Sequence, residues 1–252
     1  MLISNKESPT ATIVVYGSNG LVGKAVCTEA LRIGYDVIGL GRTKNNACTK
    51  SIEIDFLNYD HLAEITHDLI EEHNIAAAFV FCHRSRVASN LSEAEALLQA
   101  TAIDIYPYLA LKEELNKTKR KGSLNVVTVT SNAAFRYAPD VNFDYHVTKH
   151  AQIAASIGLA SVSSSLDIYS NIVSFGEVVD NSKQEHDPYH RQLFNTMRRC
   201  SSSRPVPTIG NVATATIMLC KASSIGICGQ TFVIDSGLSS ITQESIVRLL
   251  SR

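Results

Sequence analysis

The first forty residues alternate between two kinds of hydrophobic pattern. Residues 12–16 are a short run of β-branched and apolar side chains, which predicts a strand, and Gly17 ends it. From Leu21 the apolar residues recur at helical spacing, and Gly34 ends the helix that this spacing predicts. Residues 36–40 are apolar again and predict a second strand. The chain therefore opens with a strand, a glycine turn, a helix and a strand.

The same alternation continues along the rest of the chain. Further strands are expected at 51–54, 75–82, 124–130, 168–174 and 231–235, and helices at 59–72, 92–119, 145–163 and 211–222. Strands that are apolar throughout and alternate with helices predict a parallel sheet covered on both faces. Right-handed crossovers then give a doubly wound, Rossmann-type α/β fold with a mainly seven-stranded parallel sheet. No repeat or linker interrupts the pattern, so we expect one domain over residues 1–252, with a flexible N-terminus at 1–10.

Composition excludes several classes of function. The 252 residues include 23 Lys and Arg against 24 Asp and Glu, a formal charge of −1, which argues against a nucleic-acid or polybasic membrane binder. No apolar stretch is long enough to cross a bilayer, and the first ten residues lack the apolar run of a secretory signal. Six cysteines without a CxxC pair indicate reduced thiols in a cytoplasmic protein. His146 and His150 are four residues apart but have no evident third ligand, so no metal site is expected.

The first predicted turn is rich in glycine. Gly17 permits the tight turn, Gly20 permits close approach of the backbone to a pyrophosphate, and Gly23 permits close packing of helix and strand. The N-terminus of the following helix attracts the phosphate charge. We therefore expect this turn to bind a nucleotide, through Gly17, Ser18, Asn19, Gly20, Leu21 and Gly23.

The ends of the next two strands indicate which dinucleotide is bound. Arg42, Thr43 and Lys44 follow the second strand, where an acid would select the ribose hydroxyl of NAD(H) and a cation suits the 2′-phosphate of NADP(H). NADP(H) is therefore favoured, NAD(H) stays open, and a solvated basic turn is the alternative. Asp55 and Phe56 end the third strand, where they are expected to hold the adenine amino group and cover its ring.

Tyr145 and Lys149 carry the strongest chemical signal. Residues four apart share a helix face, and an ammonium beside a phenol favours its deprotonated form, so this pair can exchange a proton nearer neutral pH. Ser131 lies fourteen residues upstream, at the end of a predicted strand. A carbonyl substrate would sit at that edge of the sheet.

With these residues in place, the chain resembles the short-chain dehydrogenase/reductase family, in its compact branch. The resemblance runs from Ile13 to Ser239 and includes the Gly17–Gly23 loop, Asp55, the set Ser131, Tyr145 and Lys149, residues 171–176, and residues 229–237. It implies that Tyr145 is the general acid/base, that Ser131 positions the substrate oxygen, and that Lys149 holds the nicotinamide ribose. It further implies that Cys82, Gly176 and Val178 contact the cofactor, and that 177–207 form a substrate lid. Members of the family commonly pair into homodimers or homotetramers.

Four features depart from the family pattern. The loop glycines are spaced as in the extended, sugar-nucleotide-handling branch. Residues 82–85, Cys-His-Arg-Ser, replace the usual Asn-Asn-Ala-Gly, Asp104 stands where an asparagine completes the proton relay, and Phe175 replaces a proline. Asp104 is expected to hold a water beside Lys149 and to pair with its ammonium.

Basic residues suggest two kinds of partner. Seven arginines are expected near the active-site edge, where they suit a carboxylate or phosphate on the substrate. They are Arg84, Arg86, Arg136, Arg191, Arg198, Arg199 and Arg204. The alternative is that they are scattered over the surface. The cations from Lys117 to Lys121 complement the dipole at a helix C-terminus. A more specific interpretation is that they form a docking site for an acyl carrier protein.

Three functions therefore remain open. The first is an NADP(H)-dependent oxidoreductase that acts by hydride transfer on a small carbonyl or alcohol, either anionic or sugar-linked, with reduction of a 3-oxoacyl group on acyl carrier protein as a variant. The second is a non-catalytic, nucleotide-binding regulatory or scaffold protein. The third is an epimerase or dehydratase that recycles a tightly held cofactor.

Overall fold

The computed structural model describes residues 11–71, 78–119, 121–162, 164–179, 188–201 and 204–251. The expected flexible N-terminus at 1–10 lies outside the described residues. So do 180–187 and 202–203 of the expected lid, and 75–77 of the expected fourth strand. Among the described residues, no helix has both the length and the apolar character needed to span a membrane.

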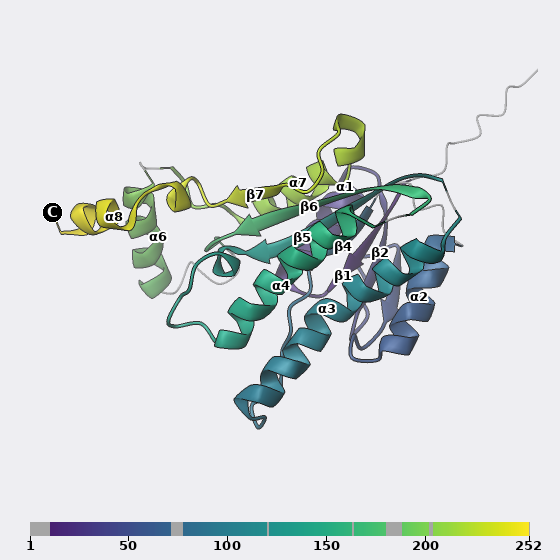
Figure 1. Cartoon of the computed structure of the whole chain (residues 1–252). Helices are drawn as coiled ribbons and strands as arrows, with labels where there is room; N and C mark the ends of the chain where they lie inside the picture. The colour runs from purple at the N-terminus through teal and green to yellow at the C-terminus, as the bar shows by residue number, and fades with distance from the viewer. Residues whose placement is uncertain are drawn as a thin grey trace, which may run out of the picture.

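Seven parallel strands form one sheet, in the order β3-β2-β1-β4-β5-β6-β7 (Figure 1). They are β1 (Thr12–Tyr16), β2 (Asp36–Gly41), β3 (Lys50–Glu53), β4 (Ala78–Phe81), β5 (Gly122–Ser131), β6 (Leu166–Phe175) and β7 (Thr231–Ile234). The chain first builds the sheet outward from β1 to β3, then returns beside β1 with β4 and builds outward in the other direction. The predicted doubly wound parallel sheet is confirmed. Its switch point lies between β1 and β4, where such folds bind ligands.

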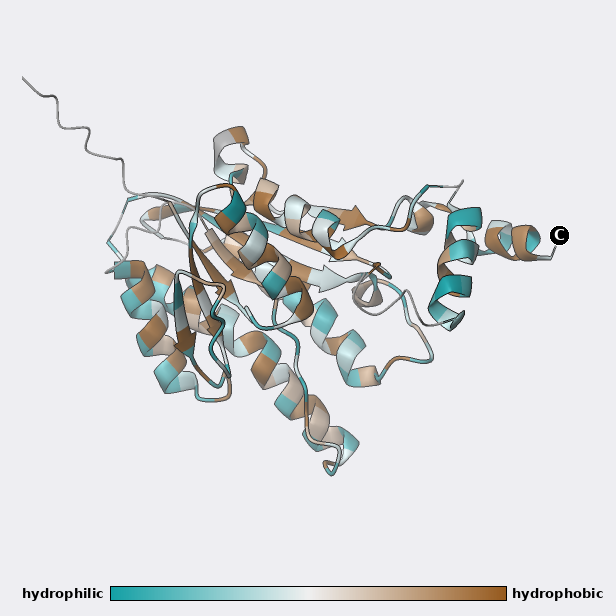
Figure 2. Ribbon diagram, turned by 180° about the vertical axis from the view of Figure 1, so that it is seen from behind, coloured by the Kyte–Doolittle hydropathy of each residue, from teal (hydrophilic) through white to brown (hydrophobic). Residues whose placement is uncertain are grey.

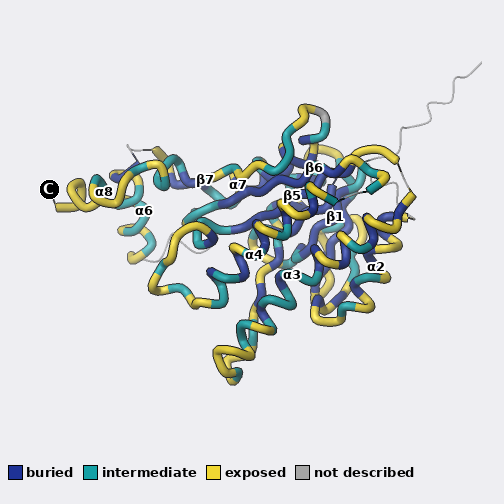
Figure 3. Tube along the Cα trace, in the orientation of Figure 1, coloured by how far each residue is buried: buried dark blue, intermediate teal, exposed yellow. Residues whose placement is uncertain are grey.

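Side chains of β1 alternate between two cores on opposite faces of the sheet, because successive residues of a strand point in opposite directions. The first core includes Val14 and Tyr16 of β1, with Leu62, Leu111 and Leu159 from α2 (Tyr59–Glu71), α3 (Glu93–Lys117) and α4 (Phe143–Ala160). The second includes Ile13 and Val15 of β1, with Val26 and Val212 from α1 (Leu21–Arg32) and α7 (Ile209–Leu219). Apolar residues accordingly concentrate on the strands and on the inner helix faces (Figure 2). The inner strands β1, β2, β4, β5 and β6 are mostly buried, whereas the edge strands β3 and β7 are not (Figure 3).

Local signals explain where several helices begin and end. Ser92 caps α3 in a capping box with Glu95, and Thr208 caps α7 in the same way with Asn211. After α1, the left-handed backbone at Gly34, with φ 92°, lets the chain turn back into β2. The predicted elements are all present, with ends shifted by a few residues.

Two helices lie where the sequence pattern predicts none. They are α6 (Pro188–Cys200), inside the expected lid, and α8 (Gln243–Leu250), near the C-terminus. Figure 1 shows both beyond the carboxyl ends of β5, β6 and β7. Arg199 of α6 donates a hydrogen bond to the carbonyl oxygen of Leu249 in α8, at 3.5 Å. The two helices therefore lie together at the edge of the sheet where the substrate is expected.

Candidate active site

The glycine turn after β1 is packed too closely for a side chain at two of its positions. Gly17 has φ +80°, and a Cβ atom there would lie 2.6 Å from Cα of His83. A Cβ atom on Gly23 would lie 2.1 Å from the carbonyl oxygen of Gly17. The turn therefore needs glycine at both positions, and it rests directly against the segment that follows β4.

The N-terminus of α1 is open above this turn. Gly20 is its N-cap residue, so no side chain caps the helix, and no acidic residue lies in the first turn. The backbone N–H groups at this end carry the positive pole of the helix dipole. A glycine cradle beneath an uncapped helix end fits the diphosphate of a dinucleotide.

Two predicted cofactor residues hold the neighbouring loops together. The side-chain amide of Asn19 donates to the hydroxyl of Thr43 at 2.9 Å and also to its carbonyl oxygen. Ser18 is buried, and its carbonyl oxygen accepts a hydrogen bond of 2.8 Å from Asn45. These contacts fix the loop after β2 beside the glycine turn. Arg42 lies exposed on that loop, and no carboxylate among the described residues pairs with it.

Asp55 and Phe56, just beyond the end of β3, differ in their surroundings. Asp55 is exposed, and its carboxylate accepts a hydrogen bond from the N–H of Leu57 at 3.1 Å. Phe56 is only 7% exposed, and its ring lies 5.9 Å from Tyr16 and 5.3 Å from His83. Apolar burial directs this ring into the core, beside the two neighbouring rings, and its place over the adenine stays a prediction.

Tyr145 and Lys149 lie together on α4, as their spacing predicts. The Nζ atom of Lys149 is 5.6 Å from the centre of the Tyr145 ring. The hydroxyl of Thr130 donates to the carbonyl oxygen of Lys149 at 3.2 Å and thereby ties α4 to the end of β5. Ser131 is the last residue of β5, and its Oγ accepts a hydrogen bond of 3.2 Å from Ala133. Three of the four side chains predicted for catalysis therefore lie at or near the junction of β5 and α4, and the fourth, Asp104, lies on α3.

The ammonium of Lys149 is directed into the protein, and the side chain is 4% exposed. It donates to Oε1 of Gln152 at 2.8 Å and to the carbonyl oxygen of His83 at 3.2 Å, and it lies 3.8 Å from the carboxylate of Asp104. Burial lowers the pKa of Lys149, the charge of Asp104 opposes this effect, and the charge of Arg84 lowers the pKa further. Gln152 was not predicted, although a glutamine three residues after Lys149 in an apolar helix is a usable signal.

Asp104 organises the unusual segment after β4. Its fully buried carboxylate accepts a hydrogen bond of 2.8 Å from the N–H of Ser85, and its carbonyl oxygen accepts one of 3.0 Å from Nε2 of His83. Burial lowers the pKa of His83 to about 4, so the ring is neutral near neutral pH. Two departures from the family pattern, at Asp104 and at residues 82–85, are therefore parts of one hydrogen-bonded cluster.

Cys82 begins this segment at the switch point of the sheet. Its N–H donates to the carbonyl oxygen of Tyr16 at 2.9 Å, which continues the pairing of β4 with β1. Burial raises the pKa of the Cys82 thiol to about 12, against a smaller opposing effect of Lys149. The residue therefore presents a neutral thiol and a backbone at the place where it is predicted to meet the cofactor.

Polar side chains from three strand ends form a second network, which was not predicted from the sequence. Asn132 accepts a hydrogen bond of 2.8 Å from the hydroxyl of Ser174 and donates one of 3.2 Å to the carboxylate of Asp235. Gly176 lies beside it, since a Cβ atom there would be 3.3 Å from Nδ2 of Asn132. Val178, the other cofactor residue predicted here, is half-buried two residues further on. The network closes the carboxyl ends of β5, β6 and β7 around this part of the chain.

The histidines of α4 hold the loop after β5 in place. Nδ1 of His146 donates to the carbonyl oxygen of Ala133 at 2.7 Å, and Nδ1 of His150 donates to that of Ala134 at 2.8 Å. No group of three metal-ligating side chains occurs within the described ranges. These histidines therefore have a structural role in placing the segment just after Ser131.

Three of the seven arginines stabilise the C-terminal segment. Arg136 donates to the carbonyl oxygen of Ser239 at 2.5 Å, Arg204 to that of Ser236 at 2.9 Å, and Arg199 to that of Leu249. Arg84 differs, because its Cζ atom lies 4.3 Å from the centre of the Tyr145 ring. The arginines therefore do not form one common cluster.

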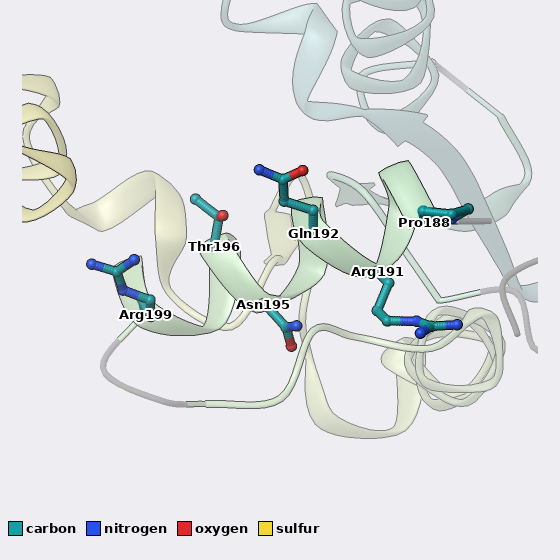
Figure 4. A pocket seen from close by; sticks show the side chains of 6 residues that line it. All are labelled: Pro188, Arg191, Gln192, Asn195, Thr196 and Arg199. Carbon is teal, nitrogen blue, oxygen red and sulfur yellow. The ribbon is translucent and has the colours of Figure 1, made fainter. Parts of the chain in front are cut away.

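A hollow of about 400 Å³ lies along α6. Figure 4 shows the side chains that line it, all from this one helix: Pro188, Arg191, Gln192, Asn195, Thr196 and Arg199. None of the residues predicted for catalysis lines it. The hollow therefore belongs to the expected lid region and not to the site around Tyr145.

The chain is similar to known proteins both in sequence and in fold. A sequence model described as enoyl-(acyl carrier protein) reductase matches residues 49–239, whereas no curated protein sequence matches the chain. Among solved structures, the ligand-free aldohexose dehydrogenase of Thermoplasma acidophilum has a TM-score of 0.74 at 17% identity, covering 93% of this chain and 96% of that one.

Two further structures were determined with a dinucleotide. A gluconate 5-dehydrogenase from Burkholderia cenocepacia, in complex with NADP and tartrate, has a TM-score of 0.72 at 15% identity and covers 92% of this chain and 96% of that one. A short-chain dehydrogenase from Leptospira borgpetersenii with bound NAD+ has a TM-score of 0.71 at 18% identity, with 95% and 97% covered. At these identities the structures establish the shared fold, and the sequence match over most of the chain establishes the family. The chain belongs to the short-chain dehydrogenase/reductase family, whose members are NAD(P)-dependent oxidoreductases acting on CH–OH and C=O groups.

Proposed function

We propose that this protein is an NADP(H)-dependent carbonyl reductase or alcohol dehydrogenase whose catalytic residues are Ser131, Tyr145 and Lys149. The observation that carries the proposal is the placement of Tyr145 and Lys149 on one face of α4, with 5.6 Å between the ammonium and the ring, next to the strand end that bears Ser131. The substrate is a small carbonyl or alcohol compound that carries an anionic group or a sugar.

Each of the three residues has a separate task in the reduction. NADPH supplies the hydride that the carbonyl carbon receives. The hydroxyl of Tyr145 gives its proton to the substrate oxygen as negative charge develops there, and the hydroxyl of Ser131 donates a hydrogen bond to the same oxygen. The ammonium of Lys149 favours the phenolate that Tyr145 becomes, and Asp104 compensates the charge of that ammonium.

The cofactor would lie across the switch point of the sheet. The cradle at residues 17–23 suits its diphosphate, and the exposed guanidinium of Arg42 suits a 2′-phosphate. Asp55 is exposed where the adenine amino group would lie. Gly176 and Val178 would lie at the nicotinamide end.

One observation favours a non-catalytic nucleotide-binding protein as the second candidate. Lys149 directs its ammonium at three acceptors inside the protein, on His83, Gln152 and Asp104. Hydrogen bonds to His83 and Gln152 use two of its three N–H groups, and the third faces the carboxylate of Asp104 at 3.8 Å, so at most one N–H group is left for the nicotinamide ribose. The two candidates differ in whether the bound cofactor is turned over.

Substitution of Tyr145 tests the proposal. NADPH consumption is measured with a panel of ketones, aldehydes and sugar nucleotides, for the wild type, Tyr145→Phe and the matched control Tyr35→Phe, which changes a tyrosine between α1 and β2. Loss of the proton donor is expected to lower kcat about 10²–10⁴-fold in Tyr145→Phe with NADPH binding unchanged. Equal rates in the wild type and Tyr145→Phe would refute the catalytic assignment. NADPH binding without turnover of any compound in the panel would favour the second candidate.

A further inference from the structure

We propose that Arg84 binds an oxyanion of the substrate, so that the substrate is a small carbonyl compound with a carboxylate or phosphate group beside the reacting carbon. This inference rests on the proposed function, since it places the anion next to the proton donor Tyr145. It assigns a role to a residue that replaces a small side chain of the family pattern.

The guanidinium of Arg84 lies on the face of the proposed catalytic tyrosine. Its Cζ atom is 4.3 Å from the centre of the Tyr145 ring, a distance typical of a cation held against an aromatic face. A guanidinium stacked in this way keeps the N–H groups at its edge available, and these match the paired oxygens of a carboxylate or phosphate. The side chain is exposed, so a ligand can reach it.

The backbone that carries Arg84 is held on both sides. His83 before it contacts the glycine turn at Gly17, and its Nε2 donates to the carbonyl oxygen of Asp104. Ser85 after it donates its N–H to the carboxylate of Asp104 at 2.8 Å. The guanidinium therefore extends from a fixed point of the site, which is the condition for precise recognition of a small ligand.

The charges around Tyr145 leave one cation without a counterion. Lys149 has the carboxylate of Asp104 at 3.8 Å, whereas no carboxylate within the described part of the chain forms an ion pair with Arg84. The charge of Arg84 contributes to lowering the pKa of Lys149, so both cations act in the same region. An anionic substrate would supply the missing negative charge.

Two other arginines near this edge are held by the C-terminal segment. Arg136 and Arg204 each donate a hydrogen bond to a backbone carbonyl oxygen there. Arg86 is exposed two residues from Arg84 but has no contact with the Tyr145 ring, which makes it a matched control.

Anion binding to the NADPH complex tests the proposal without requiring turnover. NADPH is titrated first into the wild type, Arg84→Gln, Arg84→Lys and Arg86→Gln. Calorimetric titrations of each complex then use oxamate, its uncharged isostere oxamide, and inorganic phosphate. Saturation with NADPH keeps phosphate away from the cofactor site, and the pair of oxamate and oxamide isolates the carboxylate charge.

We expect the wild-type complex to bind oxamate or phosphate, and not oxamide. Arg84→Gln should weaken this binding about tenfold or more, because a charge-assisted hydrogen bond is lost, while Arg86→Gln has no effect. Arg84→Lys should retain part of the affinity, because it keeps the charge and loses the planar fork. Binding of oxamate alone identifies a carboxylate substrate, and binding of phosphate alone identifies a phosphorylated one.

Three results would overturn the inference while leaving the proposed function intact. The wild-type NADPH complex could bind neither anion, or it could bind oxamide as tightly as oxamate. The third such result is an Arg84→Gln complex with the same anion affinity as the wild type. Failure of the wild type to bind NADPH would instead refute the proposed function. The same anion titrations on the free protein would then decide whether Arg84 binds oxyanions at all.

Discussion

His83 should make the stability of this protein depend on pH in a defined window. The side chain is 5% exposed among Phe56, Phe81 and Tyr108, and its Nδ1 atom is buried without a hydrogen-bond partner. Burial lowers the pKa from the ordinary 6.5 to about 4. Between these two values the unfolded chain binds a proton that the folded protein excludes. The free energy of unfolding therefore decreases as pH falls through this range.

The size of this effect follows from the pKa change. A fall from 6.5 to about 4 corresponds to roughly 3 kcal/mol of unfolding free energy, fully present above pH 6.5 and lost by about pH 4. His83→Gln does not titrate in this range. Between about pH 7 and about pH 4, the wild type should therefore lose roughly 3 kcal/mol more stability than His83→Gln.

Urea unfolding of both proteins across this pH range measures the difference. His61→Gln is the matched control, because it removes a histidine whose side chain is 49% exposed and lies outside the buried segment after β4. The free energy of unfolding could instead depend on pH in the same way for the wild type and His83→Gln. The folded protein would then accept a proton at His83 as readily as the unfolded chain. That result would refute the account of the segment after β4 as a neutral buried cluster.

Further predictions concern the packing of the cradle and of Lys149. Gly23→Ala should abolish NADPH binding in a titration, because its Cβ atom would lie 2.1 Å from a backbone oxygen, whereas Gly158→Ala, which meets no atom within 4 Å, should raise stability by about 0.5–1 kcal/mol. Gln152→Leu should cost about 1–3 kcal/mol in urea unfolding by leaving the buried ammonium short of an acceptor. Asp104→Asn should cost more, roughly 3–5 kcal/mol, because it removes the counterion of a buried charge; the reverse order would contradict the assigned contacts.

The sequence pattern was sufficient to predict most of the sheet and its covering helices. Apolar strands such as residues 12–16 and 124–130 alternate with helical periodicity, and glycines mark the turns between them. The pairing of Tyr145 with Lys149 was predictable for the same reason, since both lie on one helix face.

Other features depend on contacts between segments far apart in the sequence. The hydrogen bond from Ser85 to Asp104 joins residues 19 apart, and that from Asn132 to Asp235 joins residues 103 apart. Neither has a local signal in the pattern of hydrophobic and polar positions. The burial of the Phe56 side chain has no local signal either, because a strand end allows either of two directions, and only the packing of neighbouring strands decides between them.

The two unpredicted helices have a different cause. Residues 188–200 are mostly polar, and Cys200 is the one buried residue of this helix. Residues 243–250 carry no buried side chain. Neither segment has the buried apolar face by which the sequence pattern predicts a helix packed on the sheet.

Titration of the purified protein with NADPH and with NADH, followed by nicotinamide fluorescence, tests the central claim most directly. The account predicts clear preference of the wild type for NADPH. It also predicts that Arg42→Ala loses much more affinity for NADPH than for NADH, because the proposed partner of the guanidinium is the 2′-phosphate, which NADH lacks. Equal losses for both nucleotides would contradict the assignment of Arg42. Failure to bind either nucleotide would contradict the proposed oxidoreductase function itself.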